Sequence, residues 1–242
     1  MNIFRNAVFA AALAGILAGF VMTALQATFT VPLILQAETF EGAAASHDHA
    51  AAEQVAPGHS HGEEAWAPAD GFERLAFTAL ANVVTGIGFA LLLIMASELA
   101  GGIAGWRQGL IWGLAGFAAF TLAPGLGLPP ELPAMPAADL LARQVWWVGT
   151  VGATAAGLAL IAFRSQAVWA LLGVVLLVAP HIVGAPQPVS HETPVPAELH
   201  HRFVVAVTVT NLVFWLVLGA AAALARTRFA TGLSAKPQRR LA

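Results

Sequence analysis

Long apolar stretches separated by short polar segments dominate the hydrophobic pattern of the chain. Each stretch is close to or above the roughly 20 helical residues that cross a bilayer core of about 30 Å, and none carries a charge in its middle. The pattern therefore predicts an all-α, polytopic membrane protein, a single helical bundle of about six transmembrane helices. The predicted spans are residues 6–35, 75–97, 108–128, 145–163, 167–186 and 203–225.

Two features of this pattern leave alternatives open. Only the three residues 164–166 separate the fourth span from the fifth, so a five-span chain would merge or drop one of them. The first stretch, with Arg5 ahead of an apolar run, has the outline of a secretory signal peptide. The apolar region of a signal peptide is about 7–15 residues long, whereas this run is nearly thirty. We therefore expect a retained helix.

Charge is distributed unevenly between the two sides of the predicted bundle. With six spans and a cytoplasmic N-terminus, eight of the 11 basic residues lie on the cytoplasmic side, including a basic tail over 227–242. The positive-inside rule requires this bias. Twelve of the 13 acidic residues fall on the outer side, and Glu98 alone falls inside. We therefore predict that both termini are cytoplasmic, because five spans would put the basic tail outside.

The composition indicates lipid as the main solvent and excludes several functions. Hydrophobic residues make up 58% of the chain and charged residues 10%, against about 25% charged in soluble domains. The absence of cysteine excludes disulfides, iron–sulfur clusters and thiolate metal sites. The sequence contains no phosphate-binding loop, dinucleotide fingerprint or common hydrolase motif. We expect no ATP site on this chain, no conventional enzyme and no nucleic-acid binding.

All eight histidines fall on the predicted outer side, and four of them form two His-x-His pairs in one long loop. This loop, residues 42–71, is rich in His and Glu and has few large apolar residues, so we expect it to be disordered. Imidazole suits cobalt, nickel, copper and zinc, and short His-rich tracts often bind metals. The loop is either a flexible metal collector or a polar linker. Its paired histidines are His47 with His49, and His59 with His61.

Two further groups are candidate metal ligands at an entrance. His181 is the only histidine inside a predicted span, and ionisable groups at membrane depth tend to mark ion pathways. The alternative is a wet, structural position at headgroup level. Glu38 and Glu41, at the end of the first span, would face the same way on a continuing helix, where they would bind a cation or only end the helix in water. The remaining candidates, in the last outer loop, are His191, His200 and His201.

Motifs spread over most of the chain resemble CbtA, a family of predicted cobalt transporter subunits of bacterial inner membranes. They are PLILQAETFE (32–41), TLAPGLGLPPELP (121–133), RQVWWVGT and ATAAGLALIAF (143–163), PHIVGAP (180–186), VPAELHHRF (195–203) and NLVFWLVLGA (211–220). The resemblance implies cobalt uptake linked to cobalamin synthesis and a small single-span, His-rich partner subunit, CbtB. Through these motifs, the resemblance implies that Glu38, Glu41 and His181 are candidate metal-binding residues. It implies the same, less directly, for His200 and His201.

Together these observations predict a transporter subunit that takes up a divalent transition metal, with Co²⁺ as the transported substrate and no resident cofactor. Nickel stays an alternative, because nitrogen and oxygen ligands bind both ions in an order set more by the metal than by the protein. Two other classes remain open. One is a membrane sensor or scaffold that binds metal without conducting it, and the other is a metal-dependent membrane enzyme.

Overall fold

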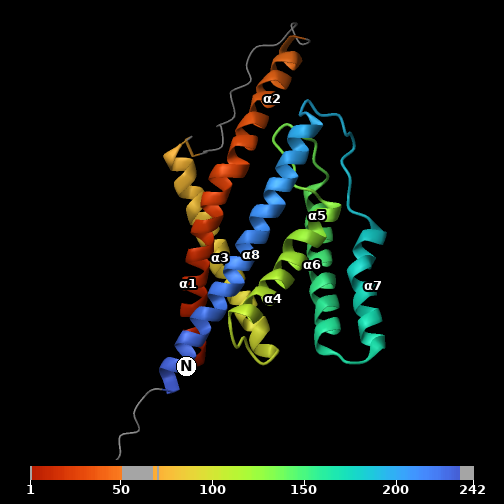
Figure 1. Ribbon diagram of the computed structural model, residues 1–242. Coiled ribbons are helices and arrows are strands. Elements are labelled where there is room, and N and C mark those ends of the chain that lie inside the picture. Colours follow the sequence, from red (N-terminus) through yellow and green to blue (C-terminus); the bar gives the residue numbers. More distant parts are fainter. Residues whose placement is uncertain (1, 51–67, 70, 235–242) are drawn as a thin grey trace, which may run out of the picture.

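The computed structural model describes residues 2–50, 68–69 and 71–234, and the side chains of 4–41, 68–69 and 71–229. Within these ranges the chain is helical and contains no β-strand (Figure 1). The elements are α1 (Asn2–Leu25), the π-helix η1 (Gln26–Thr30), α2 (Val31–Ala50), α3 (Phe72–Leu99), α4 (Trp106–Phe117), the π-helix η2 (Ala118–Leu122), α5 (Ala123–Gly127), α6 (Leu140–Phe163), α7 (Ala167–Val183) and α8 (Ala197–Ser234).

The predicted all-α membrane bundle is confirmed. Five helical segments are long and apolar enough to cross a bilayer, and α7 is a shorter apolar helix of 17 residues. At 1.5 Å per residue α7 is about 25 Å long, which is at the lower end of the spanning range. It is separate from α6 and antiparallel to it (Figure 1), so the three residues between the fourth and fifth predicted spans do form a tight turn.

The start of α1 and the end of α8 lie at the same end of the bundle (Figure 1). The amide of Asn6 donates a hydrogen bond to the carbonyl of Phe229 at 3.5 Å, and the rings of Phe9 and Phe229 are 6.4 Å apart. An even number of crossings produces this arrangement, and a five-span chain would not.

The first helix is longer than its predicted span. α1, η1 and α2 follow one another without a break and carry the helix to Ala50, although the expected span ended at residue 35 and the expected disordered loop began at 42. Residues 33–50 contain no proline, and five of them are Ala, the strongest helix former. The rest of that loop, residues 51–67 and 70, lies outside the described residues.

Each π-helix ends two residues before a proline. η1 ends at Thr30 before Pro32, and η2 ends at Leu122 before Pro124. A proline inside a helix lacks an N–H and clashes with the carbonyl four residues earlier. The wider π turn relieves that clash and lets the helix continue, but it leaves a carbonyl of the preceding turn without its usual donor. Such turns are frequent at functional sites.

Glycines bring three pairs of antiparallel helices into backbone contact. A Cβ on Gly109 of α4 would lie 2.3 Å from the carbonyl oxygen of Gly219 in α8. Similar contacts join α1 to α3 and α6 to α7, where a Cβ on Gly86 would lie 2.7 Å from the oxygen of Gly15 and one on Gly157 2.7 Å from that of Gly173. Close approach at small residues drives helix association in lipid.

The core lies where α1, α3, α4 and α8 meet. Small buried residues such as Ala14 and Ala90 alternate there with Ile94, Trp215 and Leu218. The α6–α7 hairpin stands beside this core: α7 packs mainly on α6, and α6 reaches the other helices chiefly through η2 and α5. Most large side chains of α7 are exposed, as expected for a helix that faces lipid.

We predict that Gly109→Ala destabilises the bundle by about 1–3 kcal/mol, the usual cost of overpacking, because the new methyl group would overlap the backbone of α8. Thermal unfolding of the purified protein in detergent measures the loss. Gly88→Ala is the matched control, since a Cβ there meets nothing within 4 Å. A Gly109→Ala variant as stable as this control would contradict the proposed contact.

Candidate functional site

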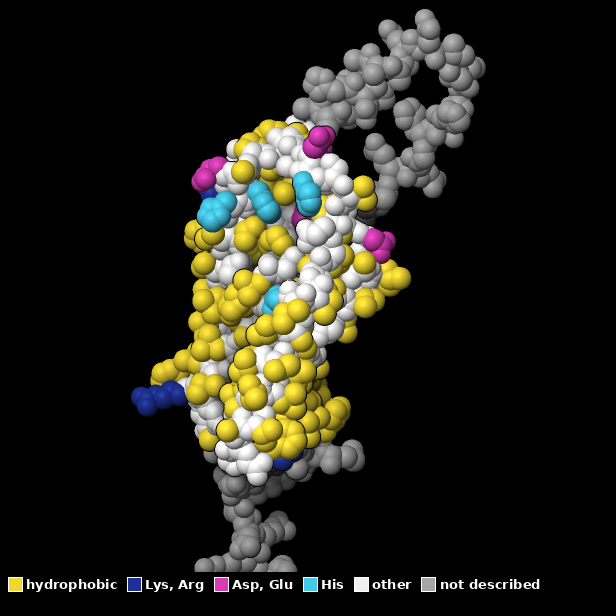
Figure 2. Space-filling model, turned by 90° about the vertical axis from the view of Figure 1, so that its right-hand side faces the viewer, with side chains coloured by type: hydrophobic (Ala, Val, Ile, Leu, Met, Phe, Trp, Pro, Cys, Tyr) yellow, Lys and Arg dark blue, Asp and Glu magenta, His cyan; other side chains and the backbone are white. Residues whose placement is uncertain are grey.

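Polar side chains gather at the end of the bundle opposite the two termini. On the face that Figure 2 shows, the histidine and acidic side chains lie toward this end, and basic side chains lie mainly toward the other. A second apolar cluster fixes the segments that carry them: Leu33 and Ala37 of α2 pack with Leu132 of the turn after α5 and with Leu199 and Phe203 of α8. Three segments distant in sequence thus meet at one surface.

Glu38 and Glu41 point to different neighbours from the same helix. Glu38 forms an ion pair with Arg74 of α3 at 2.5 Å, and each side chain is one-third exposed. Glu41 accepts a hydrogen bond from the backbone N–H of Ala134 at 3.3 Å. The two residues are three apart on one continuous helix, but each carboxylate is engaged by a different partner, so they do not face one shared site.

Ala134 is held in an uncommon backbone conformation between two segments. Its φ of 62° is positive. This conformation costs a non-glycine residue about 1–3 kcal/mol and persists only where surrounding contacts enforce it. Here its N–H is bound by Glu41, and its carbonyl accepts from the hydroxyl of Thr193 at 3.3 Å. The turn after α5 is thus joined at Ala134 to α2 through Glu41 and to the loop before α8 through Thr193.

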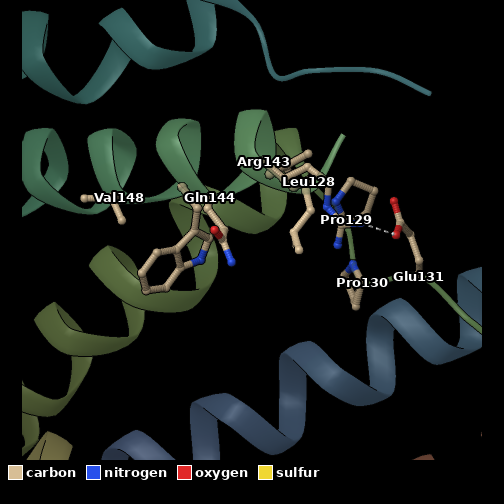
Figure 3. A pocket seen from close by; sticks show the side chains of 9 residues that line it. Leu128, Pro129, Pro130, Glu131, Arg143, Gln144 and Val148 are labelled. Carbon is tan, nitrogen blue, oxygen red and sulfur yellow. Dashed lines mark ion pairs between the residues drawn. The ribbon is translucent and has the colours of Figure 1, made fainter. Parts of the chain in front are cut away.

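That turn is also tied to α6 and α8. Glu131 pairs with Arg143 at 3.2 Å, and the ring Nε2 of His200 lies 3.1 Å from the carbonyl of Pro130, so it donates there. Figure 3 shows the ion pair at the edge of a hollow of about 510 Å³ that Gln144 and Val148 of α6 also line. One ring nitrogen of His200, Nδ1, is left for another partner.

His181 lies beside a tryptophan near the end of α7. The ring of Trp146 meets that of His181 edge-on at 6.0 Å, and its Nε1 donates to the carbonyl of Pro180 at 3.2 Å. A Cβ on Gly127 would lie 2.4 Å from the same indole, so Trp146 also contacts the end of α5. His181 is therefore part of a packed junction between α5, α6 and α7.

The remaining predicted ligands are spread out. His191 is exposed in the loop before α8, and His201 lines a separate groove beside α8. His47 and His49 lie on the last turns of α2, where side chains are not described, and His59 and His61 lie outside the described residues. Among the described side chains, no three His, Asp or Glu residues come close enough to hold a metal ion. The described candidates are therefore scattered and do not form a closed metal cage.

Polar contacts inside the membrane region accompany the π-helices. The amide of Asn82 in α3 donates to the Thr23 hydroxyl at 3.0 Å and to Gln26 Oε1 at 2.7 Å, where η1 begins. In η2, the hydroxyl of Thr121 accepts from the Trp215 indole at 3.3 Å. None of these polar residues is among the candidates predicted from the sequence; the signal that could have pointed to the two π-helices is the Phe-Thr pair shortly before each proline.

At the opposite end of the bundle, an ion pair joins α3 to α8. Arg226 of α8 forms a two-pronged pair with Glu98 of α3 and also donates to the carbonyl of Ile103 at 2.8 Å. The charge of Glu98 is thereby neutralised. The pair ties the end of α3 and the turn before α4 to α8.

This fold defines a multi-pass α-helical membrane protein whose polar groups lie mainly at the ends of its helices. A comparison with protein families identifies it further: residues 4–226 match the family described as probable cobalt transporter subunit (CbtA), and the chain belongs to that family. The resemblance inferred from the motifs is thus confirmed. Membership of a family of transporter subunits implies a membrane setting and a partner chain. No curated protein and no solved structure matches the sequence.

We predict that His200→Ala loosens the turn after α5. Loss of a hydrogen bond worth about 1 kcal/mol should raise amide exchange over residues 128–135 roughly fivefold, as measured by hydrogen–deuterium exchange of the purified protein. His191→Ala, which removes an exposed imidazole with no hydrogen bond or ion pair in the described structure, is the control. Unchanged exchange in His200→Ala would show that Pro130 is held by other contacts.

Proposed function

We propose that the chain is the membrane subunit through which a divalent transition metal, Co²⁺ in the first place, enters the cell, with the His- and carboxylate-rich end outside. The observation that carries the proposal is the separation of charge along the bundle (Figure 2), in a chain of the CbtA family. The membrane is the bacterial inner membrane. Both termini are cytoplasmic, because the basic residues gather at their end.

Capture at the outer end is weak because several of its carboxylates already have partners. Glu38 is paired with Arg74, and Glu131 with Arg143, so a metal ion must compete with an arginine for each carboxylate. Weak binding at several sites suits conduction, because the ion must leave as readily as it arrives. The histidines of residues 42–61 raise the local metal concentration, and His181, His191, His200 and His201 replace part of its water shell.

The path through the membrane follows the two π-helices, which flank α8. Proline leaves carbonyl oxygens there without helical donors, and transporters use such carbonyls to bind cations near the bilayer midplane. Asn82, Gln26 and Thr23 add side-chain oxygens beside η1. The membrane potential drives a divalent ion inward with about 4–5 kcal/mol per 100 mV, from roughly 2.3 per charge, so uptake needs no ATP site on this chain. The partner is a small single-span, His-rich subunit of the CbtB kind.

We expect cells that carry this chain, together with its partner, to accumulate several-fold more cobalt at limiting external Co²⁺ than cells that lack it. Elemental analysis of washed cells measures total metal, with low Ni²⁺ tested in parallel. Equal cobalt and equal nickel in the two strains would refute uptake. Saturable binding to vesicles containing the complex, without metal entry, would favour the scaffold.

The orientation in the membrane can be tested by cysteine labelling, because the chain contains no cysteine that would react in the background. Single cysteines at positions 49 and 239 should react with an impermeant thiol reagent from opposite sides of the membrane. Labelling of both cysteines from the same side would contradict an even number of spans. The proposed location of the metal entrance would then be wrong.

We predict that His181→Ala lowers cobalt uptake more than deletion of residues 42–64 does, because His181 lies at the membrane boundary and the deleted segment only collects ions. Initial uptake rates at several Co²⁺ concentrations provide the measurement. Because His181 packs on Trp146, its replacement can also weaken packing. His181→Gln, together with the unfolding temperature of each variant, distinguishes the loss of a metal ligand from the loss of packing. If the deletion is the more harmful change, the site belongs to the loop.

A further inference from the structure

A lipid-facing groove of about 590 Å³ runs between the first long helix and α8. One wall is formed at η1 and the start of α2 by Phe29 and Pro32, and the other by Val205 and Val209 of α8. The hydroxyl of Thr28, which also lines the groove, is bound to the carbonyl of Ala24 in its own helix at 2.8 Å. The groove therefore offers a largely hydrocarbon surface.

The groove is a built feature of the two helices. On α8 its wall follows positions 202, 205, 206, 209 and 213, and on the first helix it follows 25, 28, 29, 32 and 33. Both series have the spacing of a single helix face. The two helix faces separate near η1 and Pro32, where the first helix is wider. Closer to the two termini, α1 and α8 pack closely against each other. The depression thus lies at the depth where an acyl chain runs beside the protein.

A cationic side chain stands at the polar end of the groove. Arg202 lines it next to His201 and is exposed. Arg202 takes part in no ion pair or hydrogen bond within the described part of the chain, and no acidic residue lines the groove. The other hollow at this end differs in this respect, because its Arg143 is neutralised by Glu131 (Figure 3).

We propose that this groove binds an anionic phospholipid from the leaflet at the polar end, with its phosphate on Arg202 and an acyl chain against Phe29 and Val209. An unpaired arginine at headgroup level above an apolar furrow is complementary to a lipid that is anionic at one end and hydrocarbon at the other. The volume lies within the range of about 300–1,000 Å³ typical of small-ligand sites. A spanning helix of the partner, about 10 Å wide and 30 Å long, is much larger than the groove.

The test uses the full chain reconstituted in bilayers of equal parts phosphatidylcholine and phosphatidylglycerol, extracted gently and weighed by native mass spectrometry. The wild-type protein should retain phosphatidylglycerol in preference to phosphatidylcholine. Arg202→Gln should lower that retention about fivefold, the effect of about 1 kcal/mol for one basic residue at an anionic surface. Val209→Trp, which fills the groove without touching the arginine, should lower it as well.

Arg143→Gln is the matched control, since it removes an arginine from the same end but from a neutralised pair, and it should retain phosphatidylglycerol like the wild type. Ala206→Leu, a smaller filler, replaces Val209→Trp if the latter fails to fold. Equal retention of the two lipids, or full retention in Arg202→Gln, would overturn the proposal. So would a photo-crosslinker at position 209 that joins to a protein helix instead of lipid in native membranes.

Discussion

Contact between helix backbones at a few glycines is the interaction on which the rest of this structure depends. In a bilayer the lipid tails are as apolar as the side chains, so the hydrophobic effect does not press helices together. Van der Waals contact must do so, and it is strong only at short range. The pairs Gly15–Gly86, Gly109–Gly219 and Gly157–Gly173 supply it for α1 with α3, α4 with α8, and α6 with α7. These crossings set the positions of the long helices, and the second apolar cluster then fixes the segments that carry the polar groups.

The polar end is held more firmly than its scattered ligands suggest. A small apolar cluster, the strained Ala134 and the contact of His200 with Pro130 all fix the same turn from different helices. The carboxylates Glu38, Glu41 and Glu131 are spread out there, and each is matched with a donor of the protein itself. Among the described side chains, this surface therefore contains no preformed cluster of three His, Asp or Glu ligands for a metal ion.

Sequence reasoning found the features that depend on composition along the chain. Hydropathy located the long apolar helices, and the turn expected at Arg164 separates α6 from α7 in the structure. It failed where the answer depended on partners distant in sequence. Glu38 and Glu41 are about 60° apart around their helix, which is enough for one to meet Arg74 of α3 and the other the backbone of Ala134. The pairing of Glu98 with Arg226 was equally invisible, because 128 residues separate them.

The attachment of α6 and α7 has a mechanical consequence. These two helices pack closely against each other at Gly157 and Gly173. They contact the other helices mainly through the short segments η2 and α5. A rigid pair held along one edge can tilt as a body while the core around Ile94 and Leu218 keeps its packing. The junction at Trp146 would then act as the pivot, so tilting would change the distance between the α6–α7 pair and α8 far more than any distance inside the core.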